Sequence, residues 1–289
     1  MNFKGVFTAL ITPFKNGAVD FASLQKLVEQ QMAGGISGFV VNGTTAESPT
    51  LTEGERDQIF KKIREWTGGK LPLIMGTGTN STAQTIENTK AAEKIGADAA
   101  LVVVPYYNKP PQRGLYQHFK AVADSTKLPV ILYNVPGRTI TSLAIETVAD
   151  LAKIKNIIGI KEASGNIETA KDLLSVCGKE FIVLSGDDGT YAEFLAVGGH
   201  GVISVASHVL PQEFVAWTSG DASLARKGIA KYKTLIDMLF IEANPIPLKK
   251  ALEQMKIIAS AELRLPLVEL EAVKTEILVK EMRQCHLLK

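Results

Sequence analysis

The sequence has little cysteine and little histidine, and this scarcity argues against two classes of protein. Its 289 residues include two cysteines and four histidines. Cys177 and Cys285 lie far apart and form no Cys-x-x-Cys spacing, so we expect neither a disulfide framework nor a zinc site. Such cysteine usage is typical of proteins of the reducing cell interior, and we therefore expect a cytoplasmic location.

An excess of charge of one sign is missing too, as are long apolar runs. The 32 basic and 30 acidic residues give a net charge of +2, without a basic block or an acidic tail. We therefore expect no nucleic-acid partner and no membrane partner. The first apolar run, residues 6–13, is too short and too early for a signal peptide, and no run approaches the length of a membrane span. The expected protein is soluble.

Short apolar runs alternate with longer amphipathic segments along the first 220 residues. Eight runs have the length and composition of buried strands: Val6–Leu10, Gly38–Asn42, Leu73–Gly76, Ala99–Val104, Val130–Asn134, Ile157–Lys161, Phe181–Ser185 and Gly201–Val205. Between them lie predicted helices: Phe21–Ala33, Glu53–Trp66, Thr82–Ile95, Leu115–Asp124, Leu143–Leu151, Ile167–Val176 and Tyr191–Val197. Several begin after a capping residue, namely Asp20, Thr52, Ser81 or Ser142. Eight such units predict an α/β fold, a (β/α)8 TIM barrel.

A doubly wound open sheet is the structural alternative. A Gly-x-Gly-x-x-Gly turn after the first strand would favour it, but residues 11–14 there read Ile-Thr-Pro-Phe. We therefore predict that residues 1–221 form the barrel and carry the active site. The alternation then stops, and predicted helices at 223–240, 247–259 and 268–284 indicate a C-terminal helical extension over residues 222–289.

In the stretch from Ile157 to Ser164, the sixth apolar run ends abruptly at Lys161. In a barrel, the side chain at the carboxyl end of a strand projects toward the active site. A partly desolvated amine there loses its proton more readily and becomes a nucleophile that can form a Schiff base. The alternative is an ordinary surface lysine just past a strand.

Other polar and reactive groups follow the remaining strands: Thr44 and Thr45, Tyr106 and Tyr107, Tyr133 and Arg138, and the Gly186-Asp187-Asp188 stretch. Each alone has a simpler explanation, such as a turn, packing on the rim, a surface ion pair or the start of a helix. Together they suit carbon–carbon bond formation through an imine, with a phenol moving protons and hydroxyls and an arginine holding carboxylates. The protonated imine is itself the electron sink, so we expect no metal and no other cofactor.

Three motifs carry a resemblance to a known family: Gly43-Thr44-Thr45-x-Glu47-Ser48, Tyr133-Asn134-Val135-Pro136-Gly137-Arg138-Thr139 and Gly159-Ile160-Lys161-Glu162-Ala163-Ser164. Over essentially the whole chain they resemble the dihydrodipicolinate synthase family. The first and third are shared more loosely by N-acetylneuraminate lyases and 2-keto-3-deoxy sugar acid aldolases, so the arginine-bearing motif is the more specific. Ala46 stands where the family usually has glycine, and we expect this change to leave activity intact.

The resemblance implies a Schiff-base-forming lyase that condenses pyruvate with L-aspartate 4-semialdehyde to give 4-hydroxy-tetrahydrodipicolinate. This is the first committed step of diaminopimelate and lysine biosynthesis. Lys161 would form the imine with pyruvate, and Tyr133 would be the proton shuttle. Thr44 and Tyr107 would complete a hydroxyl relay, with Tyr107 reaching into the neighbouring subunit. The resemblance therefore implies a dimer as the minimal active unit, and a homotetramer of two dimers as the usual assembly.

The resemblance also assigns the substrate contacts. Thr45 would hold the pyruvate carboxylate, and Arg138 would hold the carboxylate of L-aspartate 4-semialdehyde. The backbone carbonyls of Gly186 and Ile203 would line the pocket. Two other functions stay open at this point: a lyase acting on a keto-deoxy sugar acid, which Arg138 disfavours, and a non-catalytic binding barrel, which the combination of Lys161, Tyr133 and Thr44 disfavours.

Control by lysine is a further property of many members of this family, in which lysine binds between two subunits. The matching positions here are Ser48, Pro49, Glu53, Arg56, Asn80, Gln84 and Tyr106. Gln84 replaces a carboxylate that receives a lysine amine, while Glu53 and Arg56 replace histidines. Because Arg56 adds a fixed cation beside a cationic ligand, we expect weak or absent inhibition by lysine.

Overall fold

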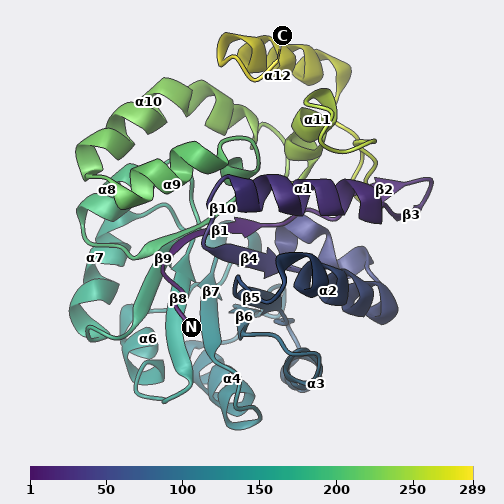
Figure 1. Ribbon diagram of the computed structural model, residues 1–289. Helices are drawn as coiled ribbons and strands as arrows, with labels where there is room; N and C mark the ends of the chain where they lie inside the picture. The colour runs from purple at the N-terminus through teal and green to yellow at the C-terminus, as the bar shows by residue number, and fades with distance from the viewer. Residues whose placement is uncertain (289) are drawn as a thin grey trace.

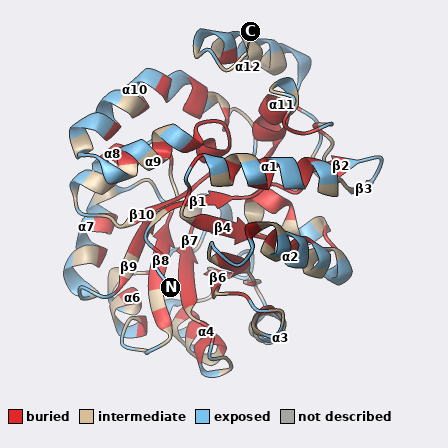
Figure 2. Ribbon diagram, viewed as in Figure 1, coloured by how far each residue is buried: buried red, intermediate tan, exposed pale blue. Residues whose placement is uncertain are grey.

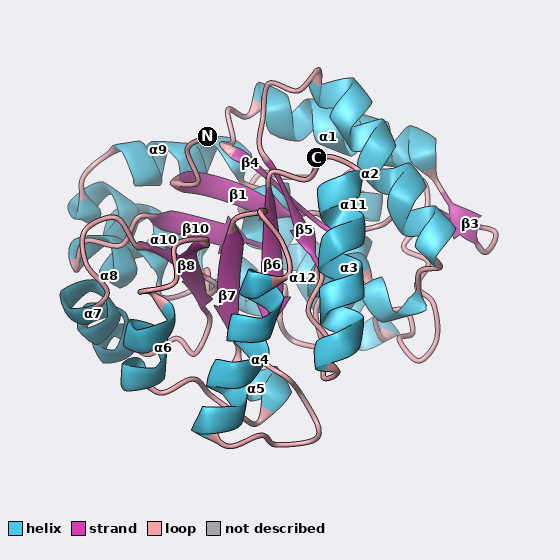
Figure 3. Ribbon diagram, turned by 90° about the horizontal axis from the view of Figure 1, so that it is seen from below, coloured by secondary structure: helices cyan, strands magenta, loops and turns pink. Residues whose placement is uncertain are grey.

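Eight parallel strands close into a barrel in the computed structural model, which describes residues 1–288 (Figures 1 and 3). The strands are β1 Gly5–Ala9, β4 Gly38–Val41, β5 Leu73–Gly76, β6 Ala99–Val103, β7 Val130–Asn134, β8 Ile157–Glu162, β9 Ile182–Ser185 and β10 Gly201–Ser204. They pair in chain order, and β1 closes the ring by pairing with both β4 and β10. The predicted (β/α)8 barrel is confirmed, and each strand lies within one residue of its predicted bounds.

Helices surround the strands on the outside of the barrel: α1 Phe21–Ala33, α2 Glu53–Thr67, α3 Thr82–Lys94, α4 Gln112–Asp124, α6 Ile145–Leu151, α7 Ile167–Val176, α8 Tyr191–Ala196 and α9 Pro211–Ser219. A two-stranded hairpin, β2 Phe14–Lys15 with β3 Ala18–Val19, follows β1, and the single turn α5 Pro136–Thr139 follows β7. Within residues 1–288, no helix has both the length and the apolar character needed to cross a bilayer.

The predicted helix caps are confirmed at three positions and wrong at the fourth. The side chains of Asp20, Thr52 and Ser81 each accept a backbone N–H of the helix that follows. Ser142 does not cap α6, whose first residue, Ile145, comes three positions later. Its hydroxyl instead donates to the Asn134 side chain at the end of β7, because that buried amide oxygen offers a tertiary partner.

Helix α9 was absent from the sequence prediction. Pro211 begins it, and Phe214 and Trp217 follow at intervals of three residues and are buried. A proline at the first helical position with apolar residues at i+3 and i+6 is nevertheless a local helix signal. The helix packs against β1, which pairs with β10, and completes the eighth βα unit.

Three helices follow the barrel: α10 Ala222–Met238, α11 Ile246–Gln254 and α12 Ala272–Gln284. In Figure 1 they run along one side and end in yellow above α1. Helix α11 ends five residues before the predicted Ala259, because tertiary acceptors replace the helical ones. The Ala259 N–H donates to the Ser23 hydroxyl, and the Ala261 N–H donates to the Glu253 carboxylate.

The apolar residues form two layers, which Figure 2 shows as buried strands inside partly buried helices. One fills the barrel interior and includes Phe7, Ile131, Tyr133 and Ile203. The other packs the outer faces of the strands against the helices. Because both faces of each strand are covered, the strands are nearly uniformly apolar, and a polar side chain at a strand end is conspicuous.

Candidate active site

Lys161 lies inside the barrel near the carboxyl end of β8. It stands opposite Tyr133 in the register between β7 and β8, and its amine lies 4.3 Å from the centre of the Tyr133 ring. Both side chains are buried, with 7% of Lys161 and 8% of Tyr133 exposed. Lys161 is therefore not a surface lysine, and its nearest aromatic neighbour carries a hydroxyl.

Gly186 directly follows β9 and borders the Lys161 side chain. A Cβ added at Gly186 would lie 2.7 Å from Lys161 Cε and 2.5 Å from Ala163 Cβ, closer than side-chain atoms pack. Its N–H donates to the Glu162 carbonyl at 2.7 Å, which fixes this approach. The missing side chain therefore leaves the room that the lysine side chain occupies.

Thr44 and Thr45 lie in a short 3-10 helix, Thr44–Ala46, that follows β4. Thr45 is buried, and its hydroxyl accepts a hydrogen bond of 2.8 Å from the Asn244 amide. Ala46 fits without strain because it lies within this right-handed helix, and its carbonyl accepts from the Thr12 hydroxyl at 2.9 Å. The left-handed backbone conformation falls instead on Glu47, with φ of 55°.

Arg138 lies on α5, directly after β7, and its side chain is exposed. Its guanidinium donates to the Asn244 backbone carbonyl at 3.3 Å. The segment around α5 is anchored by Asn134, whose side-chain oxygen accepts from the Ser142 hydroxyl and from the Leu143 N–H. The arginine therefore stands at the mouth of the barrel with its charge free of a carboxylate partner within residues 1–288.

A cavity of about 450 Å³, here called the central cavity, brings most of the predicted site residues together. Its lining includes Thr44, Thr45, Tyr133, Arg138, Lys161 and Gly186. Ile203 lies beneath it in the barrel core, and the Val205 that follows β10 lines it instead. Tyr107 does not line it, and its side chain is 87% exposed.

Buried Asp188 holds Val205, a residue of the central cavity lining, in place. One of its carboxylate oxygens accepts the N–H groups of Val205 and Ala206, at 2.9 and 2.8 Å, and so holds the segment that follows β10. Complete burial raises the pKa of Asp188 to about 6, and these hydrogen bonds oppose the rise. Asp187, next to it, lines the cavity and accepts from the Thr190 N–H ahead of α8.

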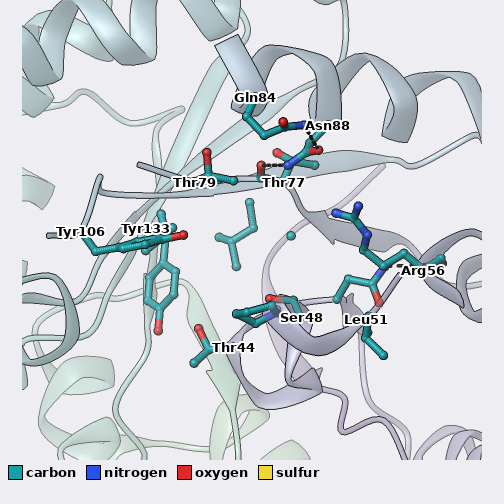
Figure 4. A pocket seen from close by; sticks show the side chains of 17 residues that line it. Thr44, Ser48, Leu51, Arg56, Thr77, Thr79, Gln84, Asn88, Tyr106 and Tyr133 are labelled. Carbon is teal, nitrogen blue, oxygen red and sulfur yellow. Dashed lines mark hydrogen bonds between the residues drawn. The ribbon is translucent and has the colours of Figure 1, made fainter. Parts of the chain in front are cut away.

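Most of the predicted lysine-binding residues line a second cavity of about 350 Å³, here called the side cavity (Figure 4). Ser48, Pro49, Arg56, Gln84 and Tyr106 line it, and so do Thr44 and Tyr133, which it shares with the central cavity. Glu53 lies in a smaller adjoining recess of about 140 Å³. Asn80 lines none of the three, and its carbonyl accepts from the Asn108 amide.

Sequence reasoning missed the residues that the C-terminal extension brings to the central cavity. Phe240, Glu242, Ala243 and Asn244 all line it. The Asn244-Pro245-Ile246-Pro247 stretch falls at the junction between the predicted helices at 223–240 and 247–259. A polar residue in a rigid proline-rich break is a signal for a structured loop, but nothing local indicates which cavity the loop reaches.

The fold and the central cavity together are typical of class I aldolases, (β/α)8 barrels in which a buried lysine at a strand end attacks a carbonyl. A model of the dihydrodipicolinate synthetase family matches residues 2–285. The chain belongs to this family and is an enzyme of it, which confirms the resemblance seen in the motifs.

Individual relatives agree along the full length. The 4-hydroxy-tetrahydrodipicolinate synthase of Bdellovibrio bacteriovorus is 65% identical, with 99% of each chain covered. The chloride-inhibited dihydrodipicolinate synthase of Acinetobacter baumannii, solved in complex with pyruvate, is 42% identical with a TM-score of 0.96, covering 99% of this chain and 100% of that one. The enzyme of Cyanidioschyzon merolae, solved with lysine bound, is 40% identical with a TM-score of 0.94 and covers 99% of each chain.

Proposed function

We propose that the central cavity is the site at which this chain carries out the 4-hydroxy-tetrahydrodipicolinate synthase reaction. Lys161 attacks the ketone of pyruvate and forms an imine with loss of water. Removal of a methyl proton gives an enamine, which attacks the aldehyde of L-aspartate 4-semialdehyde. The amino group of the product then displaces Lys161 as the ring closes. The observation that carries the proposal is the buried pair of Lys161 and Tyr133 in one cavity with Thr45 and Arg138.

The proposed roles follow from where each group lies. The Lys161 amine lies over the Tyr133 ring, and the Tyr133 hydroxyl is proposed to move protons during imine formation. Thr44 borders both cavities and is proposed to extend the proton relay outward. Thr45 lies deeper and is proposed to bind the pyruvate carboxylate. Gly186 leaves the space for the imine, whereas Ile203 lies beneath the central cavity.

Turnover with two alternative substrates tests the proposal. Purified protein is given pyruvate with L-aspartate 4-semialdehyde in one assay and N-acetylneuraminate in the other. We expect product only in the first assay, because Arg138 suits a substrate with its own carboxylate better than a polyhydroxylated sugar. Cleavage of the sugar acid without condensation would contradict the proposal.

Loss of the Arg138 guanidinium should weaken one substrate selectively. We expect Arg138→Ala to raise the KM for L-aspartate 4-semialdehyde roughly ten- to 150-fold, the equivalent of about 1.5–3 kcal/mol for a charge-assisted contact. The KM for pyruvate should change far less, since Thr45 holds that substrate. Arg113→Ala, which removes an exposed arginine on α4, is the control. An equal rise in both KM values would place Arg138 elsewhere.

We also propose that the working assembly is a homotetramer built from two dimers. The support is Tyr107, an aromatic side chain held 87% exposed on a backbone with φ of 75°, which suits insertion into a second copy. Residues 1–221 are proposed to be the barrel domain and residues 222–289 an extension packed on it. A cytoplasmic location is proposed because a biosynthetic enzyme of this pathway uses pyruvate and an amino-acid aldehyde as substrates.

Inhibition by lysine should be weak or absent in this enzyme. Gln84 donates to the Asn88 side chain and offers no negative charge to the side cavity. Glu53 is exposed and forms no ion pair with Arg56 within residues 1–288. The positive charge of the Arg56 guanidinium, which lines the side cavity, is therefore not neutralised by Glu53. Losing the charge-assisted contact should cost about 1 kcal/mol per bound lysine, and Arg56 adds repulsion.

The lysine prediction is checked by measuring turnover at rising lysine concentration. The double variant Arg56→His with Gln84→Glu is the matched comparison, and we expect it to gain sensitivity. Strong inhibition of the unaltered protein by sub-millimolar lysine would contradict the prediction and would indicate that Glu53 turns inward to bind the ligand.

A further inference from the structure

The loop that carries Thr44 and Thr45 contains a buried carboxylate that the proposed chemistry does not use. Glu47 lies between two 3-10 helices, Thr44–Ala46 and Ser48–Thr50, in a left-handed backbone conformation with φ of 55° and ψ of 39°. This conformation is strained for any residue with a Cβ. The Glu47 side chain is fully buried, so the strained backbone conformation places a carboxylate in the protein interior.

Lys249, on α11 of the C-terminal extension, is the partner of this carboxylate. Its side chain is also fully buried, and its amine forms an ion pair with Glu47 Oε1. The amine also donates to the Glu262 carbonyl at 2.9 Å and lies 4.1 Å from the centre of the Phe14 ring. The pair therefore joins a loop of the barrel to the extension in the interior of the protein.

The second oxygen of Glu47 is held by the extension as well. Glu47 Oε2 accepts a hydrogen bond of 3.0 Å from the backbone N–H of Arg264. The Arg264 guanidinium binds both carboxylate oxygens of Glu55, at 2.5 and 2.9 Å, and donates to the Thr50 carbonyl at the other end of the same loop. This contact holds the pKa of Glu55 to about 2. Lys249 and Arg264 thus fix the loop at its middle and at its end.

Stability alone does not account for a fully buried ion pair. Removing two charges from water is expensive, and well-packed apolar residues of similar volume often give equal or greater stability. The cost is visible at Lys249: burial lowers the pKa of its amine to about 8, although the neighbouring Glu47 acts to raise it. What an ion pair provides and an apolar contact does not is a fixed direction for the loop backbone.

We propose that the Glu47–Lys249 pair is a positioning device that sets the Thr44–Thr45 loop relative to Lys161. Thr45 lies two residues before Glu47, and a change in the loop backbone at Glu47 moves the hydroxyl groups that face the central cavity. Asn244, from the same extension, fixes the Thr45 hydroxyl directly. The pair therefore governs how well pyruvate is bound and oriented, which rests on the proposed function of this loop.

Three variants test the proposal: Lys249→Met, Glu47→Gln and the two together. Each single variant leaves one buried polar or charged group without its partner and should lower Tm. The double variant replaces both charges and should recover most of the Tm. We expect its KM for pyruvate to stay raised about ten- to a hundredfold, or its kcat to fall by a similar factor, because small misplacements of a binding group have effects of this size.

The control is Lys250→Met, which removes the neighbouring α11 lysine and its 2.7 Å ion pair with Glu253 but touches no part of the loop. It should leave the KM for pyruvate unchanged. All kinetics are measured at a temperature at which each variant is folded, as judged by circular dichroism. If the double variant does not fold, Lys249→Met is compared with Lys250→Met at low temperature, and equal values of both kcat and the KM for pyruvate overturn the proposal.

The outcomes separate the two proposals. A double variant that recovers both Tm and kinetics shows that the pair has only a structural role, and the positioning proposal falls while the proposed function stands. If the unaltered protein neither forms a reducible adduct with pyruvate nor turns over the substrates, the proposed function is wrong, and the positioning proposal that rests on it is wrong too. A recovered Tm with a persistent kinetic defect supports both.

Discussion

Lys161→Ala should abolish covalent capture of pyruvate and lower turnover by roughly 10⁴-fold or more, because no other amine lines the central cavity within residues 1–288. Unaltered protein incubated with pyruvate and borohydride should gain the mass of one reduced adduct per chain. The variant should gain none. Peptide mapping of the adduct in the unaltered protein identifies the modified residue.

The matched control for this experiment is Lys155→Ala. Lys155 is an exposed lysine just ahead of β8, on the same segment of chain as Lys161. Its removal should leave both capture and turnover unchanged. An adduct that maps to any lysine other than Lys161 would overturn the assignment of the nucleophile.

Tyr133→Phe should lower kcat by ~10²–10⁴ while leaving the KM for pyruvate within a small factor, since a positioned acid–base group acts on the transition state. The ring remains in place beside the Lys161 amine, so the variant removes the hydroxyl and little else. Steady-state kinetics with both substrates measure the effect, and the rate of adduct formation with borohydride shows whether imine formation is the step that slows.

Tyr191→Phe provides the comparison. Tyr191 is fully buried, and its hydroxyl is hydrogen-bonded to Thr218 at 2.6 Å, away from the central cavity. Its loss should change stability without changing kcat. Near-normal turnover of Tyr133→Phe would mean that Tyr133 only packs against the lysine.

The strands and the nucleophile could be predicted because their signals are local. A run such as Val130–Asn134 is apolar on both faces, and a lysine that ends such a run is exceptional whatever lies around it. The barrel followed from the number and order of those runs. The resemblance then supplied the roles of Tyr133 and Arg138, which spacing alone left open.

The parts that could not be predicted depend on tertiary partners far away in the chain. Serine is a common helix-capping residue, but the Ser142 hydroxyl donates to the buried side-chain oxygen of Asn134. It therefore does not cap α6. Asn244 lies in a proline-rich break, and its link to Thr45 spans 199 residues. No pattern within a short window of sequence contains such a pairing.

That separation of 199 residues has a consequence for the order in which the enzyme becomes competent during its synthesis. A ribosome adds about 5–20 residues per second, so Asn244 is made roughly 10–40 s after Thr45. β10, which closes the barrel against β1, also comes late in the chain. A nascent chain therefore carries Lys161 well before the walls of its cavity exist, and the amine can acquire its selective reactivity only when the last quarter of the protein has emerged.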